Sequence, residues 1–344
     1  MADRVLTLRE LNRTVLLRQM LLRRERVSVV RAVERLAGLQ AQSPPSPYLA
    51  LWSRVEGFEH RALDRALLSG RVVRALLMRA TIHTVSARDL PFFDAAVREA
   101  RTVGRVRGTP PPSAEVVERI VALTRDRPLT RNEVMEALGF HPRTPNVEEL
   151  RTYSWVLALG RLERMPESGL WGFRGSPAFA PADHELAPQP EASAYLVRRY
   201  LAAFGPATRA DLSQWSGVPV RDLTPGLETL KLRTFRDERG RELLDLLRAP
   251  LAQANVVAPP RLLPRWDELL LAHADRTRVL PEEYRKTVIK KNGDVLQTFL
   301  VDGFVAGIWR EERGRIVLEP FKSIPRTARQ ELEDEARRLE EWLR

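Results

Sequence analysis

Two glutamines separated by one small residue are the most distinctive polar feature of the sequence. Gln40 and Gln42 lie in the segment LQAQSP, where a predicted helix ends against prolines. Side chains two positions apart in an extended or irregular segment can converge on one pocket, which they cannot do within a regular helix. Such a pair is able to position a water molecule or a substrate with its amide groups. Two solvated glutamines at the end of a helix are the alternative.

The residue sets of most enzyme classes are missing from the sequence. The chain has no cysteine, which excludes disulfides, thiolate nucleophiles and cysteine-bound metals. The histidines lack the spacing of a metal site, so we expect no bound metal. No glycine-rich phosphate loop follows a strand and no GxSxG motif occurs, so we expect neither a cofactor nor an esterase nucleophile. The five histidines are His60, His83, His141, His184 and His273.

Composition and charge favour a polyanion as the partner. The 344 residues are 44% hydrophobic, enough for two or three compact domains. Lys and Arg number 56 against 45 Asp and Glu, a net charge of +11, and only five of the cations are Lys. Guanidinium groups fork onto phosphate oxygens and guanine edges, although a GC-rich genome also produces an arginine bias. No apolar run approaches the roughly 18 residues of a membrane span, and the first residues lack the apolar core of a signal peptide, so we expect a cytoplasmic protein.

The segment that carries the glutamines is predicted to combine helices with one pair of strands. Thr7 and Glu10 predict a capping box at the start of the first helix. Residues 72–87 are rich in β-branched side chains and predict two strands, after which Ser86 and Asp89 cap another helix. Further helices are predicted at residues 28–40, 48–55 and 60–68.

An internal repeat organises the middle of the chain. The segments PLTRNEVMEALG, at 128–139, and PATRADLSQWSG, at 206–217, share one pattern. In each copy a threonine and an acid three positions later predict a capping box, and a glycine predicts the end of a short helix. Helices are predicted before the copies at 114–124 and 192–203, and after them at 147–159 and 221–231, followed by short strands within 162–173 and 232–246.

Two helices flanking a short one, followed by a β wing, are typical of a winged helix. A capped helical hairpin within an ordinary bundle is the alternative. The last part of the chain differs, because Asp302 and Gly303 divide two alternating strands and predict a hairpin. A third strand, RIVLEPF, and a terminal helix at 327–343 complete it. We therefore expect a mainly α fold with small antiparallel β wings, in the α+β class.

Four separated motifs, in this order, resemble the AlkZ and YcaQ group of bacterial DNA glycosylases. The resemblance spans residues 11 to about 320 and implies three tandem winged-helix domains in a C-shape that clamp duplex DNA. A β-hairpin near the C-terminus would approach the minor groove. The implied domains are 1–108 with the glutamine pair, 113–185 and 190–255, with a proline linker at 108–113 and a C-terminal hairpin segment and helix at 256–344. The motifs are GLQAQSP, VVRALLMRATIHTVSARDL, AAFGPATRADLSQWSG and LLPRWDELLLAHADRTRVL.

The resemblance also implies a catalytic motif. In the family it is a glutamine, an apolar residue, and then a glutamine or an aspartate. Here Gln40, Ala41 and Gln42 match it. The second glutamine is similar to the AlkZ branch, which removes bulky adducts and unhooks interstrand crosslinks, and differs from the YcaQ branch with its acid. The role, general repair or self-protection against a genotoxin, stays open.

Two neutral amides suffice only for a reaction whose leaving group is already good, because glutamine is neither a nucleophile nor a strong base. Alkylation at N7 or N3 puts a positive charge on a purine, so its glycosidic bond breaks without an added proton. The site then needs only to position water and to favour the developing charge. None of the five lysines lies near the glutamines in sequence, so no amine is expected to form a Schiff base. We expect a monofunctional enzyme.

The expected partner is double-stranded DNA with alkylated or crosslinked purines, bound by a monomer in the cytoplasm at the nucleoid, without a membrane or a nucleotide cofactor. A winged-helix protein that binds DNA without chemistry, such as a regulator or a damage sensor, is the alternative function. Trp266 and Asp267 resemble family positions, but Trp266 is expected in the core and Asp267 at a helix cap or in an ion pair. For His83 and His273 a buried structural role is the alternative to DNA contact. The predicted DNA contacts are Arg79, His83, His273, Arg276, Lys290 and Lys291.

Overall fold

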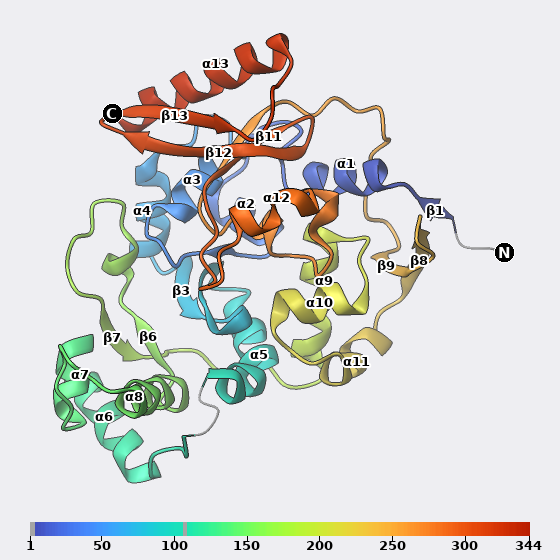
Figure 1. Cartoon of the computed structure of the whole chain (residues 1–344). Helices are drawn as coiled ribbons and strands as arrows, with labels where there is room; N and C mark the ends of the chain where they lie inside the picture. Colours follow the sequence, from blue (N-terminus) through green and yellow to red (C-terminus); the bar gives the residue numbers. More distant parts are fainter. Residues whose placement is uncertain (1–3, 106–108) are drawn as a thin grey trace.

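The computed structural model describes residues 4–105 and 109–344. These residues form a mixed α+β fold with thirteen α-helices and four small sheets (Figure 1). Residue 108, where the first predicted domain ends and the predicted linker begins, lies outside the described residues. In the part of the chain that the structure covers, no helix combines the length and the apolar character that a membrane crossing requires.

The N-terminal segment surrounds a three-stranded antiparallel sheet with helices. The strand order is β2-β4-β3, and β3 pairs along its length with β4, as residues 72–87 predict. The capping box of Thr7 and Glu10 is present at the start of the first helix, which confirms that prediction. The elements are β1 (Val5–Leu6), α1 (Leu8–Arg18), α2 (Val29–Arg35), β2 (Leu39–Gln40), α3 (Ser46–Trp52), α4 (His60–Leu68), β3 (Val72–Leu76), β4 (Ile82–Ser86) and α5 (Leu90–Arg105).

The helix predicted at 28–40 is too long. It ends at Arg35 because Ala37 and Gly38 adopt positive φ angles of 56° and 93°, which a helix does not tolerate. A side chain at Gly38 would also meet Val85, with 2.9 Å between the added carbon and its methyl. The turn sends the chain into strand β2, so Gln40 lies in a sheet rather than at a helix end.

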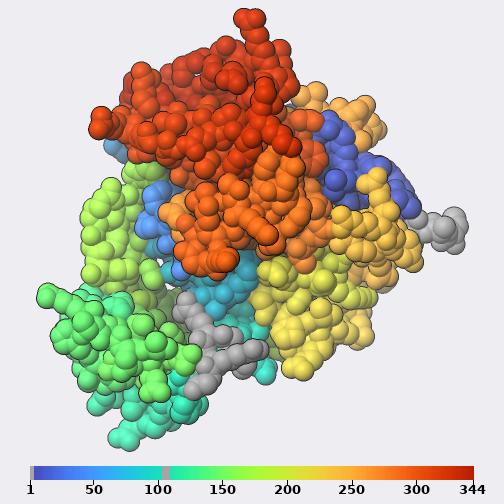
Figure 2. Space-filling model, in the orientation of Figure 1, coloured from blue at the N-terminus to red at the C-terminus, as the bar shows by residue number. Residues whose placement is uncertain are grey.

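The second segment has a core of its own. Its strands pair in the order β5-β7-β6, and the capping box of Thr130 and Glu133 is present. The second strand lies later than predicted, because Pro166–Gly169 form a 3-10 turn where a strand was expected. In Figure 2 this segment, coloured green, is a lobe beside the rest of the molecule. The elements are α6 (Ala114–Asp126), β5 (Leu129–Thr130), α7 (Arg131–Ala137), α8 (Val147–Leu159), β6 (Leu162–Arg164) and β7 (Ala178–Pro181).

The third segment repeats that order of helices. Thr208 and Asp211 form the second predicted capping box, and Gly217 ends the helix in a left-handed conformation. Strand β1 from the start of the chain adds in parallel to the sheet β8-β9. The last helix ends at Glu228, three residues before the predicted end. The elements are α9 (Glu191–Phe204), α10 (Arg209–Ser216), α11 (Val220–Glu228), β8 (Leu232–Asp237) and β9 (Glu242–Leu246).

The C-terminal segment forms a four-stranded antiparallel sheet covered by the last helix, drawn in red in Figure 1. The predicted hairpin is confirmed, but its turn does not project from the molecule. Arg9 forms two hydrogen bonds to the Asp302 carboxylate, at 2.7 and 2.9 Å, and Gly303 packs against Asn12 of α1. The elements are β10 (Arg261–Leu263), α12 (Glu282–Val288), β11 (Thr298–Val301), β12 (Phe304–Glu312), β13 (Arg315–Pro320) and α13 (Arg326–Leu343).

The largest apolar core joins three of these segments. Side chains of α1, α5 and α9 meet residues that follow β9, including Leu263 and Leu280. A second core links α2, α3 and α4 to the C-terminal sheet and α13. Residues that are far apart in the sequence are thereby brought next to the glutamine pair.

Candidate active site

Gln40 lies in strand β2 directly opposite His83 of β4. Its side chain is buried, with 6% of the residue exposed, and its Oε1 accepts a hydrogen bond of 2.9 Å from the Arg79 guanidinium. A guanidinium can only donate, so the amide oxygen must face Arg79 and the NH2 group must point elsewhere. The orientation of the Gln40 amide is therefore set by its partner.

Arg79 connects three parts of the chain at this point. It lies in the 3-10 turn Met78–Ala80 between β3 and β4, with a positive φ of 54°. Its guanidinium donates to Gln40, to the Trp215 carbonyl and, at 2.7 Å, to Oε1 of Glu268. An arginine so committed within the protein has few donors left for DNA. Arg79 thus holds Gln40 in place, and its contact with a DNA phosphate stays a prediction.

Glu268 is a site residue that the sequence analysis missed. It is buried, with 4% exposed, and its Oε1 also lies 3.0 Å from Nε2 of His83. Burial alone would raise the pKa of this carboxyl, but Arg79 and His83 lower it to about 2. Among the described residues its Oε2 has no hydrogen-bond partner, and Glu268 lines a small cavity with Gln40 and Trp266. Two acids inside the apolar run of WDELLLA were the available signal.

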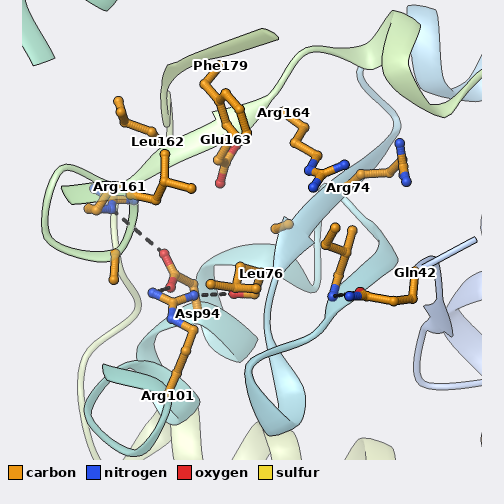
Figure 3. A pocket seen from close by; sticks show the side chains of 14 residues that line it. Gln42, Arg74, Leu76, Asp94, Arg101, Arg161, Leu162, Glu163, Arg164 and Phe179 are labelled. Carbon is orange, nitrogen blue, oxygen red and sulfur yellow. Dashed lines mark hydrogen bonds and ion pairs between the residues drawn. The ribbon is translucent and has the colours of Figure 1, made fainter. Parts of the chain in front are cut away.

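Gln42 follows β2 and has the opposite environment. Its side chain is exposed, and its Oε1 accepts a hydrogen bond of 3.2 Å from the backbone N–H of Ile82. Because the amide oxygen accepts this hydrogen bond, the NH2 group of Gln42 points elsewhere and can donate to a ligand. Gln42 lines a separate cavity of about 110 Å³, seen in Figure 3. The two glutamines therefore do not converge on one closed cavity, contrary to the expectation from their spacing.

The backbone between the glutamines is held on both sides. The Ala41 N–H donates to the Ile82 carbonyl at 2.7 Å, and the Ala41 carbonyl accepts from Arg74 at 2.9 Å. Arg74 is buried in β3 and also donates to the Ser168 carbonyl of the second segment. The glutamine segment is thus fixed by the N-terminal sheet and tied to the neighbouring lobe.

A model of the AlkZ-like DNA glycosylase family matches residues 33–342. The chain belongs to this family. An interstrand DNA cross-link repair glycosylase from Streptomyces sahachiroi is 26% identical over 346 residues, covering 93% of this chain and 92% of that protein. The solved structure of Streptomyces sahachiroi DNA glycosylase AlkZ superimposes with a TM-score of 0.79 at 23% identity, over 96% of this chain and 95% of that one.

The family resemblance drawn from four motifs is thereby confirmed, and the model match includes the positions of Gln40 and Gln42. The structural likeness confirms the mixed α+β class. For this AlkZ-like protein the geometry adds a feature that the motif does not contain. The buried carboxylate of Glu268, 185 positions after His83, is linked through Arg79 to Gln40.

Two of the predicted DNA contacts are buried in this family member. His83 has 0% of its surface exposed and lies between Glu268 and the Thr81 carbonyl. His273 is also buried, and its Nε2 lies 3.1 Å from the Phe204 carbonyl. Burial and the neighbouring Arg278 lower the pKa of His273 to about 3. Both histidines therefore occupy buried positions, which is the structural role given above as the alternative to DNA contact.

The remaining predicted contacts lie nearer the surface. Lys290 and Lys291 are exposed in a tight turn that ends at Gly293. Trp266, which was expected in the core, is half-buried beneath this turn and donates from Nε1 to the Gly293 carbonyl at 3.1 Å. The turn is thus adjacent to the cavity that contains Gln40. Arg276 is half-buried, and burial together with Arg285 and Arg79 lowers its pKa.

No group of three or more side chains suited to metal binding occurs in residues 4–105 and 109–344. The buried ion pair of Arg54 and Asp267, with nitrogen and oxygen 2.8 Å apart, instead supports the floor of the Gln40 cavity. Asp267 also accepts from the Leu269 N–H, which agrees with its predicted role as a cap.

Proposed function

We propose that the protein is a monofunctional DNA glycosylase that hydrolyses the N-glycosidic bond of purines alkylated at N7 or N3. The observation that carries this proposal is the fixed Gln-Ala-Gln segment of a DNA glycosylase family member. Gln40 is oriented by Arg79 and Glu268, whereas Gln42 is exposed beside an open cavity. A DNA-binding protein without chemistry has no evident need for a buried, ionised carboxylate that orients one amide.

The proposed chemistry relies on the charge of the damaged base. The alkylated purine leaves with the electron pair of the glycosidic bond and becomes neutral, and the sugar becomes oxocarbenium-like. The oxygen of a water molecule then bonds to C1′ and its proton passes to solvent. Because Gln42 is exposed, we assign it to contact with the water molecule and the sugar. The groups available for these contacts are its NH2 group and the lone pair of its oxygen that does not accept from Ile82. Gln40 supplies a fixed dipole close to the developing charge.

Unmodified purines are poor substrates in this account. Their departure needs a proton, and the site provides no strong general acid, because the pKa of Glu268 is held at about 2 and that carboxyl is ionised. Lys290 and Lys291 lie on an exposed turn beside the site, and neither lines the cavity of Gln40 or that of Gln42, which supports a glycosylase that leaves an abasic site without cutting the strand.

We extend the proposal to bulky adducts and interstrand crosslinks. The relative from Streptomyces sahachiroi is named as an interstrand cross-link repair glycosylase. The exposed position of Gln42 supports this extension, because a site that does not enclose the base leaves room for a large modification. Lys290 and Lys291 are proposed as phosphate contacts on double-stranded DNA.

The proposal includes three winged-helix domains, at 1–108, 113–185 and 190–255, arranged around duplex DNA, in a monomer that acts at the nucleoid in the cytoplasm. The two capped helix repeats, each followed by a pair of strands, support the domains at 113–185 and 190–255. The sheet β2-β4-β3 provides the corresponding wing of the first.

The direct test uses purified protein with duplexes that carry N7-methylguanine, an interstrand crosslink or undamaged guanine. We expect alkali-labile abasic sites from the first two and none from the third. Sodium borohydride should trap no covalent complex. Binding of all three duplexes without release of base would contradict the proposal and leave a DNA-binding protein. A trapped complex would contradict the monofunctional mechanism.

A further inference from the structure

The cavity beside Gln42 lies between the N-terminal sheet and the second segment. Strand β3 and helix α5 form one wall, and α8 with strands β6 and β7 form the other. Four arginines and two carboxylates line it, so positive charge is in excess. The two kinds of charge are not evenly distributed in the cavity, as Figure 3 shows.

The side of the cavity away from Gln42 is compensated. Oδ1 of Asp94 forms an ion pair of 2.9 Å with Arg101, and its Oδ2 lies 3.7 Å from Arg161 and 3.1 Å from His184. Glu163 lies nearby, and burial raises the pKa of its carboxyl. The charges on this side therefore compensate one another.

The side next to Gln42 is not compensated. Among the described residues no carboxylate pairs with Arg74 or Arg164; the Arg74 guanidinium donates only to carbonyls and to Ser168. Arg164 lies with its guanidinium carbon 5.7 Å from the centre of the Phe179 ring. Burial, and then Arg164, lowers the pKa of Arg74 to about 10, which still leaves it protonated at neutral pH. Two adjacent guanidinium groups therefore remain without a counter-charge.

The third group on this side is the Gln42 amide. Because its oxygen faces the Ile82 N–H, the group left free is an NH2 donor. Donors from Arg164, Arg74 and Gln42 with no facing carboxylate match a ligand that carries negative charge and only acceptors. A phosphate group has this chemistry, and arginine binds it through forked hydrogen bonds.

We propose that the part of this cavity lined by Arg164, Arg74 and Gln42 binds a phosphate group. Arg164 is its main ligand, because Arg74 is already used to hold Ala41 and Ser168. The assignment of this phosphate to DNA rests on the proposed function. A backbone phosphodiester next to the damaged nucleotide would bring the sugar of that nucleotide to Gln42. Free inorganic phosphate has the same chemistry, and the tests separate the two sources.

The first test detects anion binding at this site without the use of DNA or catalysis. The thermal midpoint of unfolding of the full chain is measured in inorganic phosphate and in sodium chloride of equal ionic strength. We expect phosphate to raise the midpoint of the wild type and of Arg125→Gln, but not of Arg164→Gln. Arg125 is a matched control because it is exposed on α6 of the same segment, outside the cavity. An equal rise in Arg164→Gln would overturn the site.

The second test asks for the DNA source. Each phosphate near a tetrahydrofuran abasic-site analogue is replaced in turn by an uncharged methylphosphonate, and duplex affinity is measured. At one position we expect the wild type to lose roughly tenfold in affinity, as for a charge-assisted hydrogen bond. Arg164→Gln should lose less than about twofold there, because its contact is already absent.

The outcomes are distinct. Loss at one phosphate that depends on Arg164, together with the phosphate effect on the midpoint, supports a DNA backbone site. The midpoint effect alone retains the phosphate site with free phosphate as its ligand and overturns the DNA source. If neither effect is observed, the inference is overturned. All readouts are binding or stability, so failure to release a base would contradict the proposed function without touching this result.

Discussion

Gln40 and Gln42 are separated by one residue, yet their surroundings differ in burial, charge and contacts. Gln40 is buried and bound to Arg79, and Glu268 in turn contacts both Arg79 and His83. Gln42 is exposed, accepts a hydrogen bond from a backbone N–H, and lies beside Arg74 and Arg164, with which no carboxylate of the described residues pairs. The difference indicates a division of labour, in which the first amide is preorganised by the protein and the second is completed by the substrate.

The largest expected effect on stability comes from a substitution in the network that holds Gln40. Glu268→Gln removes the charge that Arg79 and His83 share, so the free energy of unfolding should fall by roughly 3–5 kcal/mol, as for a buried ion pair that loses one partner. Chemical denaturation measures it. Glu283→Gln, at an exposed pair with Lys322, is the control and should leave stability unchanged. Equal stability of Glu268→Gln and wild type would show that the network does not stabilise the folded protein.

The pH dependence of stability sharpens the same point. The pKa of Glu268 is about 2 in the folded protein, below its ordinary value of 4.5, so the folded state favours the ionised form. Its contribution of roughly 3 kcal/mol is present above pH 4.5 and is lost as the pH falls toward 2. The stability difference between wild type and Glu268→Gln should therefore shrink between pH 5 and pH 3. A constant difference over that range would contradict the assignment.

Alanine at each glutamine compares the two sides directly. Gln40→Ala leaves a buried donor of Arg79 without its acceptor and should cost about 1–3 kcal/mol of unfolding free energy. Gln42→Ala should change stability by no more than about 0.5 kcal/mol, because water can replace an exposed amide. Denaturant midpoints of the two variants provide the measurement, and the reverse order of stability would refute the division proposed here.

The smallest effect is expected at the exposed turn. Lys290→Ala and Lys291→Ala should each weaken duplex binding and lower the salt slope of the affinity by about one, as for the loss of one phosphate contact. Titrations at several salt concentrations measure this slope. Lys322→Ala, at an exposed lysine paired with Glu283, is the control. A slope that stays the same in both turn variants would exclude them as phosphate contacts.

Local features of the fold were predictable from the sequence. The capping boxes at Thr7, Thr130 and Thr208, and the turn at Asp302 and Gly303, depend on residues a few positions apart. The strand at Gln40 was not predictable, because it forms only by pairing with residues 83 and 84. Helical spacing before it continues without a break until the positive φ of Ala37 and Gly38 ends the helix.

The candidate site was likewise predictable only in its local features. The motif identified Gln40 and Gln42, but the partners that decide their orientation come from distant segments. Glu268 reaches Arg79 only because the C-terminal segment shares a core with the N-terminal one. The same packing buries His83 and His273, whose exposure cannot be inferred from local sequence. Residue type suggested contact with DNA, whereas tertiary packing buries both side chains.

In the proposed mechanism, two neutral amides release a purine that alkylation has already primed. Single-turnover release from a duplex with N7-methylguanine, measured alongside duplex affinity for wild type and Gln42→Ala, tests it most directly. We predict that the rate falls roughly 100-fold or more, as for the loss of a positioned catalytic group, while the affinity changes by less than about twofold. An unchanged rate in Gln42→Ala would remove this amide from the mechanism.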